Sequence, residues 1–138
     1  MSKVQRVVSI GAHSLDAELM GGPLLLKYAK QGAHCTCMHV TQGRLEDPNA
    51  TKEECDAYLK ELLDQNQRAA AKLGADTLWL GYVSSNMPTT EVFSDRLEKY
   101  FIDEKVDLVI HRHTKAGTIG TRFPGPDSGC PPFFIIFW

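Results

Sequence analysis

One histidine and one aspartate stand three residues apart near the start of the chain, at His13 and Asp16. They follow residues 4–10, an apolar run rich in β-branched side chains that has the composition of a buried parallel strand. Open α/β sheets bind their ligands at the carboxyl ends of their strands, so a loop in this place suits a site. An imidazole nitrogen and a carboxylate oxygen are ligands that zinc accepts. We therefore predict that His13 and Asp16 bind a metal ion.

The alternative is a structural role for the same two residues. The ring of His13 can form a hydrogen bond with Asp16, and Asp16 can cap the helix that follows, because helix N-termini favour carboxylates. We predict that Glu18 is an acid in the first turn of that helix rather than a metal ligand.

The elements that must position this loop alternate between strand and helix. The strands are predicted at residues 4–10, 34–41, 77–80 and 106–110. The helices are predicted at residues 24–29, from the Thr51–Glu54 capping box to about Leu73, and after Thr89 or Thr90. Such alternation implies right-handed βαβ units. The predicted fold class is α/β, a Rossmann-like parallel sheet with flanking helices.

The doubly wound strand order 3-2-1-4 places the first and fourth strands side by side. The loop with His13 and Asp16 would then face the residues after the fourth strand, which include His111 and His113. We predict a role in the site for one of these two histidines. Residues at the end of the second strand are predicted to line a substrate pocket, namely Gln42, Gly43 and Arg44. A solvated loop charge is the alternative for Arg44, and residues 84–86 are predicted to form a turn.

Composition excludes several classes of function. The chain has 138 residues, of which 43% are hydrophobic and 23% are charged, which is typical of one globular domain. A net charge of −2 without a Lys/Arg cluster argues against nucleic-acid binding. No apolar run approaches the ~20 residues of a membrane span, and no signal peptide is evident. We expect a cytoplasmic protein with reduced cysteines, and the oligomeric state stays open.

Several motifs together resemble the PIG-L/LmbE-like family of zinc-dependent de-N-acetylases. Residues 12–18, Ala-His-Ser-Leu-Asp-Ala-Glu, are similar to the family's first motif, Ala-His-Pro-Asp-Asp-(Ala/Glu)-Glu. Later segments resemble further motifs in the same order, at residues 40–43, 68–75, 78–82 and 106–110. The resemblance covers residues 4–113. We predict that residues 1–113 form the Rossmann-like core.

The resemblance implies that zinc is bound by His13, Asp16 and a third histidine after the fourth strand. His113 is the candidate for that third ligand, and His111 is the alternative. The implied activity is removal of acetyl from an N-acetylated sugar or a similar small amide, with a carboxylate as general base.

Three departures from the family's pattern oppose this activity. Leu15 stands where the family has its general-base aspartate, and leucine cannot accept a proton. No histidine follows His113, and the helix before Arg68 lacks the Arg and Glu pair that holds substrate in the family. The catalytic residues therefore stay unassigned. The alternative function is a non-catalytic member or fragment of the fold that acts as a binding or interaction domain, and a nucleotide binder is a third interpretation.

The last segment, residues 114–138, changes character. It is rich in Gly, Pro, Thr and Ser and ends in a bare apolar run, residues 133–138. We predict an irregular tail, truncated or aberrant, and a fold that is incomplete at its C-terminus.

Overall fold

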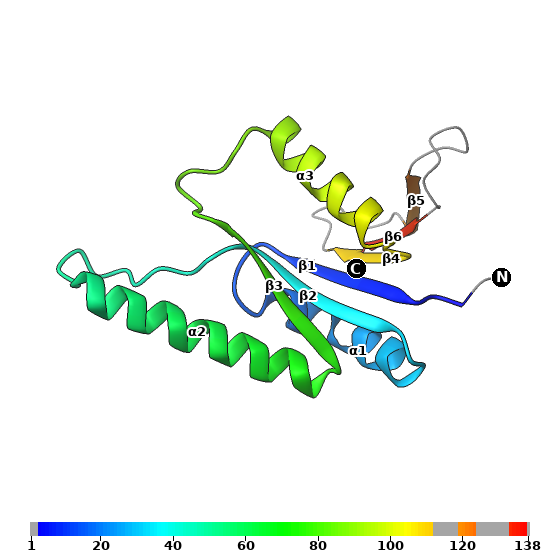
Figure 1. Ribbon diagram of the computed structural model, residues 1–138, viewed down its shortest axis with the longest axis horizontal. Helices are drawn as coiled ribbons and strands as arrows, with labels where there is room; N and C mark the ends of the chain where they lie inside the picture. The colour runs from blue at the N-terminus through cyan, green and yellow to red at the C-terminus, as the bar shows by residue number, and fades with distance from the viewer. Residues whose placement is uncertain (1–2, 112–118, 124–132, 138) are drawn as a thin grey trace.

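The computed structural model describes residues 3–111, 119–123 and 133–137, which are arranged around a six-stranded sheet (Figure 1). The strands are β1 (Arg6–Gly11), β2 (His34–Thr41), β3 (Ala75–Tyr82), β4 (Leu108–His111), β5 (Ile119–Phe123) and β6 (Phe133–Phe137). The helices are α1 (Asp16–Lys30), α2 (Lys52–Lys72) and α3 (Thr90–Asp103). The strand order is β3-β2-β1-β4-β6-β5, and every neighbouring pair is parallel except β5 with β6.

The predicted α/β class and the predicted order of the first four strands are confirmed. β1 lies between β2 and β4, with Ile10 opposite Met38 on one side and His111 on the other. Since these strands run in the same direction, their carboxyl ends meet at one edge of the sheet. The loops that follow β1, β2 and β3 therefore gather at that edge.

The prediction of an irregular tail over residues 114–138 differs from the structure at two places, because β5 and β6 are strands. β6 pairs with β4 in parallel, and its sequence, Phe-Phe-Ile-Ile-Phe, has the composition of a strand. Without β6, β4 would present an unpaired edge of backbone groups.

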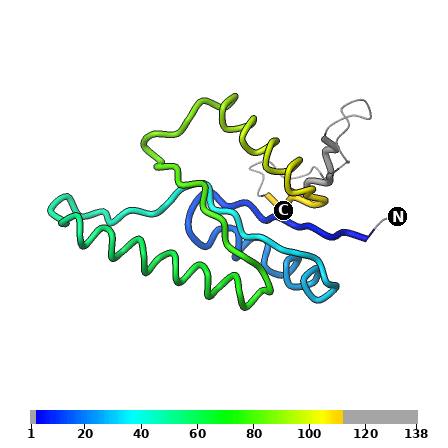
Figure 2. Tube along the Cα trace, viewed as in Figure 1, coloured from blue at the N-terminus to red at the C-terminus, as the bar shows by residue number. Residues whose placement is uncertain are grey.

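The helices cover both faces of the sheet. The Cα trace shows α1 and α2 on one side and α3 on the other (Figure 2). Because side chains alternate along a strand, Val7 and Cys37 pack against Leu25 of α1, whereas Val8 and Met38 belong to the cluster on the α3 side. The thiols of Cys35 and Cys37 share the α1 face and are buried and free, as the alternation predicts.

Local signals fix most of the helix ends. The capping box of α2 is present, since the Thr51 hydroxyl accepts from Glu54 N at 3.2 Å and Thr51 N donates to the Glu54 carboxylate at 2.8 Å. At α3 the Thr89 hydroxyl accepts from Val92 N at 3.4 Å, without the reciprocal bond of a capping box. In the part of the chain that the structure describes, no helix is long and apolar enough to cross a membrane.

Helix α1 begins at Asp16, eight residues before the predicted start at Leu24. Gly21, Gly22 and Pro23 have the composition of a helix breaker but lie inside this helix. Gly21 is required by a close approach, since a Cβ there would lie 2.7 Å from the Cβ of Ser9 on β1. Gly21 thus lets α1 pack tightly against the sheet, which a local pattern does not reveal.

Candidate functional site

The loop that joins β1 to α1 carries both predicted metal ligands, and we call residues 12–15 the His13 loop. Nδ1 of His13 lies 3.3 Å from Oδ2 of Asp16, and the backbone N–H of His13 donates to the same oxygen at 2.9 Å. The ring of His13 is 69% exposed. The contact between ring and carboxylate that belongs to the structural alternative is therefore present. The cap by Asp16 that belongs to the same alternative is absent, because Leu15 is the N-cap residue and makes no side-chain cap.

The backbone of the His13 loop is strained at Leu15, whose φ of 65° lies in the left-handed region. That conformation costs a non-glycine residue about 1–2 kcal/mol, so surrounding contacts must hold it. Oδ1 of Asn66, a buried residue of α2, accepts two hydrogen bonds from the loop. One comes from Leu15 N at 3.1 Å and the other from the Ser14 hydroxyl at 3.0 Å.

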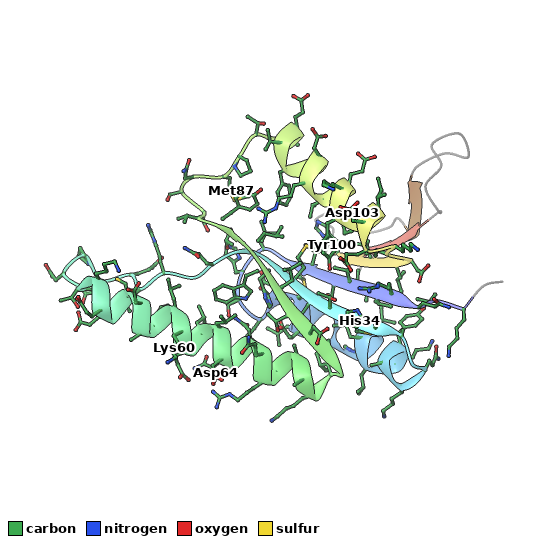
Figure 3. The ribbon with its side chains drawn as sticks, in the orientation of Figure 1. His34, Lys60, Asp64, Met87, Tyr100 and Asp103 are labelled. Carbon is green, nitrogen blue, oxygen red and sulfur yellow. The ribbon has the colours of Figure 1, made fainter. Side chains whose placement is uncertain are left out.

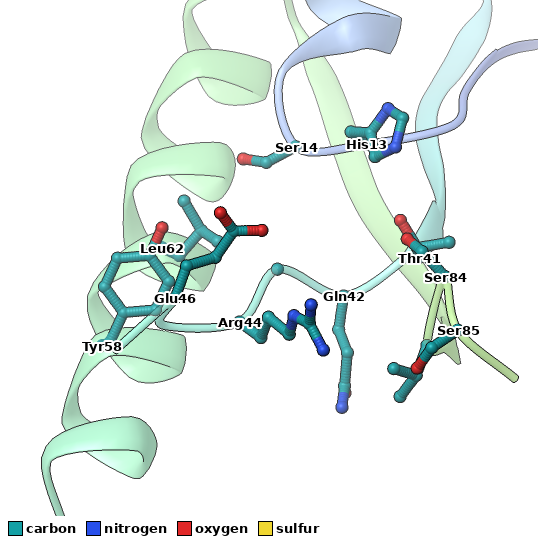
Figure 4. A pocket seen from close by; sticks show the side chains of 12 residues that line it. His13, Ser14, Thr41, Gln42, Arg44, Glu46, Tyr58, Leu62, Ser84 and Ser85 are labelled. Carbon is teal, nitrogen blue, oxygen red and sulfur yellow. The ribbon is translucent and has the colours of Figure 1, made fainter. Parts of the chain in front are cut away.

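Two cavities open beside the His13 loop, at the carboxyl edge of the sheet. The first, which we call the polar cavity, has a volume of about 650 Å³ and lies between the loops after β1, β2 and β3 and the side of α2 (Figure 4). Its lining comprises His13, Ser14, Thr41, Gln42, Gly43, Arg44, Glu46, Tyr58, Leu62, Val83, Ser84 and Ser85.

The second, the apolar cavity, has a volume of about 380 Å³ and lies between the strand ends and α3. Its lining comprises Ile10, Ala12, His13, Val40, Thr41, Ser84, Met87, Phe93, Leu97 and His111. The two cavities share His13, Thr41 and Ser84. The imidazole of His13 therefore stands at the junction between a polar and an apolar compartment.

The structure brings most of the predicted site residues together. Gln42, Gly43 and Arg44 line the polar cavity with His13, and His111 lines the apolar cavity with it. Figure 4 shows the side chains of Gln42 and Arg44 on the opposite side of the polar cavity from His13. Asp16 touches the ring of His13 but lines neither cavity. His113 lies outside the described residues.

The two donor atoms of His13 and Asp16 have a spacing that suits one zinc ion. Two ligands of a tetrahedral zinc, each about 2.0–2.1 Å from the metal, lie about 3.4 Å apart, and the observed separation is 3.3 Å. Within residues 3–111 and the strands β5 and β6, no group of three His, Cys, Asp or Glu side chains could hold a metal. The described residues therefore offer two donor atoms with the spacing of zinc ligands and not a third.

A buried pair of ionisable residues lies beneath the His13 loop. Oε2 of Glu18, in the first turn of α1, lies 2.9 Å from Nε2 of His39 on β2, and the His39 side chain is fully buried. Glu18 is thus an acid of the first turn, as predicted, but it is buried against His39. Burial raises the pKa of the neighbouring Cys37 thiol, and the charge of Glu18 raises it further.

Some residues around the site are absent from the sequence prediction. Asn66 stands four residues after Leu62 and four before Ala70, in the apolar phase of α2, so its polarity at that position is a signal. Thr41 donates its hydroxyl to Ala12 O at 2.7 Å and ties the end of β2 to the His13 loop. The predicted turn at residues 84–86 is present, and Ser84 in it also lines both cavities. The His39–Glu18 contact has no signal in the sequence, because it depends on how α1 lies on the sheet.

Comparisons with known proteins agree with this geometry. The profile of the family described as PIG-L, GlcNAc-PI de-N-acetylase, matches residues 8–121. Mycothiol S-conjugate amidase of Streptomyces coelicolor is 29% identical over 115 residues, which cover 78% of this chain and 38% of that protein. The chain therefore spans well under half of the length of that relative.

Solved structures with the same fold include enzymes of different chemistry. N,N'-diacetylchitobiose deacetylase from Pyrococcus horikoshii superposes with a TM-score of 0.64 at 22% identity, over 78% of this chain and 40% of that chain. A 4-carboxy-2-hydroxymuconate hydratase from Pseudomonas putida KT2440 superposes with a TM-score of 0.62 at 19% identity, over 77% and 46% of the two chains. These likenesses establish the fold, and the reaction must be argued from the site.

Proposed function

The chain belongs to the PIG-L family, and on that premise we propose that it is a metal-dependent hydrolase of N-acylated small molecules. The observation that carries the proposal is the pair His13 and Asp16, with donor atoms 3.3 Å apart on the loop after β1. His13 also borders both cavities, where a small molecule can be enclosed. An amidase and a deacetylase among the similar proteins support an N-acetylated sugar or a related amide as substrate.

His13 and Asp16 would hold zinc, with His113 as the proposed third ligand. His111, the alternative, lines the apolar cavity but forms no group of three donors with them. Bound zinc would polarise an amide carbonyl and make water more acidic. The chain's own residues have separate tasks. The backbone N–H of His13 donates to Oδ2 of Asp16 at 2.9 Å and holds the carboxylate beside the imidazole, as hydrogen bonds to ligating carboxylates do.

The polar part of the substrate would bind in the polar cavity. Gln42 offers an amide, and Arg44 offers a guanidinium that can donate two parallel hydrogen bonds to a carboxylate or phosphate. Gly43 has no side chain, and a Cβ at this position would collide with Leu62. These three residues are proposed to position the substrate so that its amide reaches His13.

Leu15 limits the rate of the proposed reaction. The His13 loop carries no carboxylate at this position, and loss of a general base lowers a rate about 10²–10⁴-fold. The backbone of Leu15 is left-handed, a conformation that Asp and Asn tolerate better than leucine does. Leu15→Asp should therefore place a proton acceptor in the loop without distorting it.

The test is release of amine from N-acetylglucosamine by the zinc-loaded chain. Leu15→Asp should raise the rate at least a hundredfold. Leu15→Asn should not, because asparagine has the shape of aspartate but cannot act as a base. His13→Ala should abolish the activity of Leu15→Asp. Absence of hydrolysis in folded, zinc-loaded Leu15→Asp would refute the proposed activity.

A second candidate function is binding without catalysis. Leu15 favours it, because leucine cannot accept a proton where the family has a general-base aspartate. In that case N-acetylglucosamine would bind to the polar cavity, and neither the wild-type chain nor Leu15→Asp would release amine.

A further inference from the structure

The apolar cavity beside His13 is much larger than an acetyl group requires. An acetyl group ends in a single methyl, whereas a cavity of roughly 150 Å³ already holds benzene. The apolar cavity has a volume of about 380 Å³. It therefore has room for a chain of more than six carbons.

The walls of this cavity have the chemistry that an alkyl chain needs. Ile10 and Val40 come from the ends of β1 and β2, and Phe93 and Leu97 come from α3. Met87 comes from the loop before α3, and Figure 3 shows it beside that helix. Apolar side chains thus contribute from the sheet, the loop and the helix, and burial of an alkyl chain against them is favourable.

Apart from His111, the polar side chains of the apolar cavity stand where it meets the polar cavity. His13, Thr41 and Ser84 line both cavities, so the two compartments communicate at the proposed reacting centre. A molecule with a polar head and an apolar chain can occupy both compartments with its amide at this junction.

We infer that the substrate is an N-acyl compound with a medium-length aliphatic acyl chain, bound in the apolar cavity, and a polar head, bound in the polar cavity. This inference rests on the proposed function for its reacting centre. Hydrolysis would break the amide C–N bond, join the oxygen of water to the acyl carbon and transfer a proton to the amine. The products would be a fatty carboxylate and a free amine.

The test is equilibrium binding, because it does not depend on turnover. N-acetyl-, N-butanoyl- and N-hexanoylglucosamine would be titrated into the full chain by calorimetry. Each buried methylene favours binding by about 0.8 kcal/mol, which corresponds to about a fourfold gain in affinity. We expect affinity to rise up to fourfold per methylene. Equal affinity for all three compounds would overturn the inference.

Two neighbouring residues of α3 provide a matched control. Phe93 lines the apolar cavity, whereas Val92 is 56% exposed and does not line it. Phe93→Ser should weaken binding of the hexanoyl compound about tenfold or more and weaken binding of the acetyl compound by much less. Val92→Ser should change neither. Met87→Ser, on a loop, provides a second test if Phe93→Ser does not fold. If Phe93→Ser and Val92→Ser have equal effects, the alkyl chain does not bind in the apolar cavity. The same conclusion follows if Met87→Ser leaves the chain-length dependence intact.

The outcomes separate this inference from the proposed function. Chain-length-dependent binding without hydrolysis by Leu15→Asp would retain the acyl site and refute the hydrolase. Hydrolysis of the acetyl compound with no preference for longer chains would retain the hydrolase and refute the acyl site.

Discussion

Replacement of Asn66 by alanine should loosen the His13 loop while hardly changing the stability of the whole chain. The variant removes two hydrogen bonds, from Ser14 and Leu15, that together contribute about 2 kcal/mol. Two gains offset this loss in the free energy of unfolding. Nδ2 of Asn66 is buried with no partner among the described residues. Alanine removes this unsatisfied group and so recovers about 1–3 kcal/mol. Alanine also favours a helix over asparagine by about 0.7 kcal/mol.

The assay combines hydrogen exchange of the Leu15 amide with denaturant unfolding. In Asn66→Ala the Leu15 amide should exchange about thirtyfold faster, which corresponds to 2 kcal/mol, while the free energy of unfolding changes by about 1 kcal/mol or less. Asn66→Asp should give the opposite result. Its carboxylate can accept both hydrogen bonds and protect Leu15, but a buried charge lowers the stability of the fold. Unchanged exchange of Leu15 in Asn66→Ala would refute the claim that α2 holds the loop.

Three further predictions test the packing around the site. Gly21→Ala should lower the free energy of unfolding by more than about 2 kcal/mol, because the new Cβ would collide with Ser9. Gly22→Ala has room for a Cβ and should be neutral or stabilising by up to about 1 kcal/mol. Equal effects of the two variants in urea unfolding would contradict this reasoning. Glu18→Ala should lower the free energy of unfolding by about 3 kcal/mol, because it leaves His39 buried without its partner. If the losses of Glu18→Ala and of a His39 variant simply add in the double mutant, the pair is not coupled. Because burial raises the pKa of Cys37 above its ordinary 9.0, the folded chain keeps a proton that the unfolded chain releases at high pH. Stability should therefore be full below pH 9 and fall above it, and Cys37→Ala should reduce that fall; an identical decline in the variant would contradict the assignment.

The order of the first four strands was predictable from the sequence because it follows from local patterns. Four apolar runs separated by helices leave few topologies, and the rule for ligand sites in α/β sheets then places His13 near the end of β4. The structure confirms this, since His13 and His111 line the same cavity.

Features that depend on tertiary packing were not predictable in this way. Gly21, Gly22 and Pro23 have the local propensity of a breaker, yet the close approach of α1 to Ser9 keeps them inside a helix. The contact of Glu18 with His39 requires the register of α1 on β2, which no period in the sequence encodes.

The candidate site is intermediate between these cases. The pair His13 and Asp16 was predictable because both residues are on one loop, and the structure brings them into contact. Asn66 is distant in sequence from that loop, and its polar side chain in the apolar phase of α2 was the only indication of its role.

Whether His13 and Asp16 bind a metal is decided by the amount of zinc bound per chain, in the wild type and in Asp16→Asn. We expect nearly one zinc per wild-type chain and a large loss in Asp16→Asn, with both proteins folded. If neither folded protein binds zinc after it is supplied, His13 and Asp16 are not metal ligands, and the proposed hydrolase is refuted.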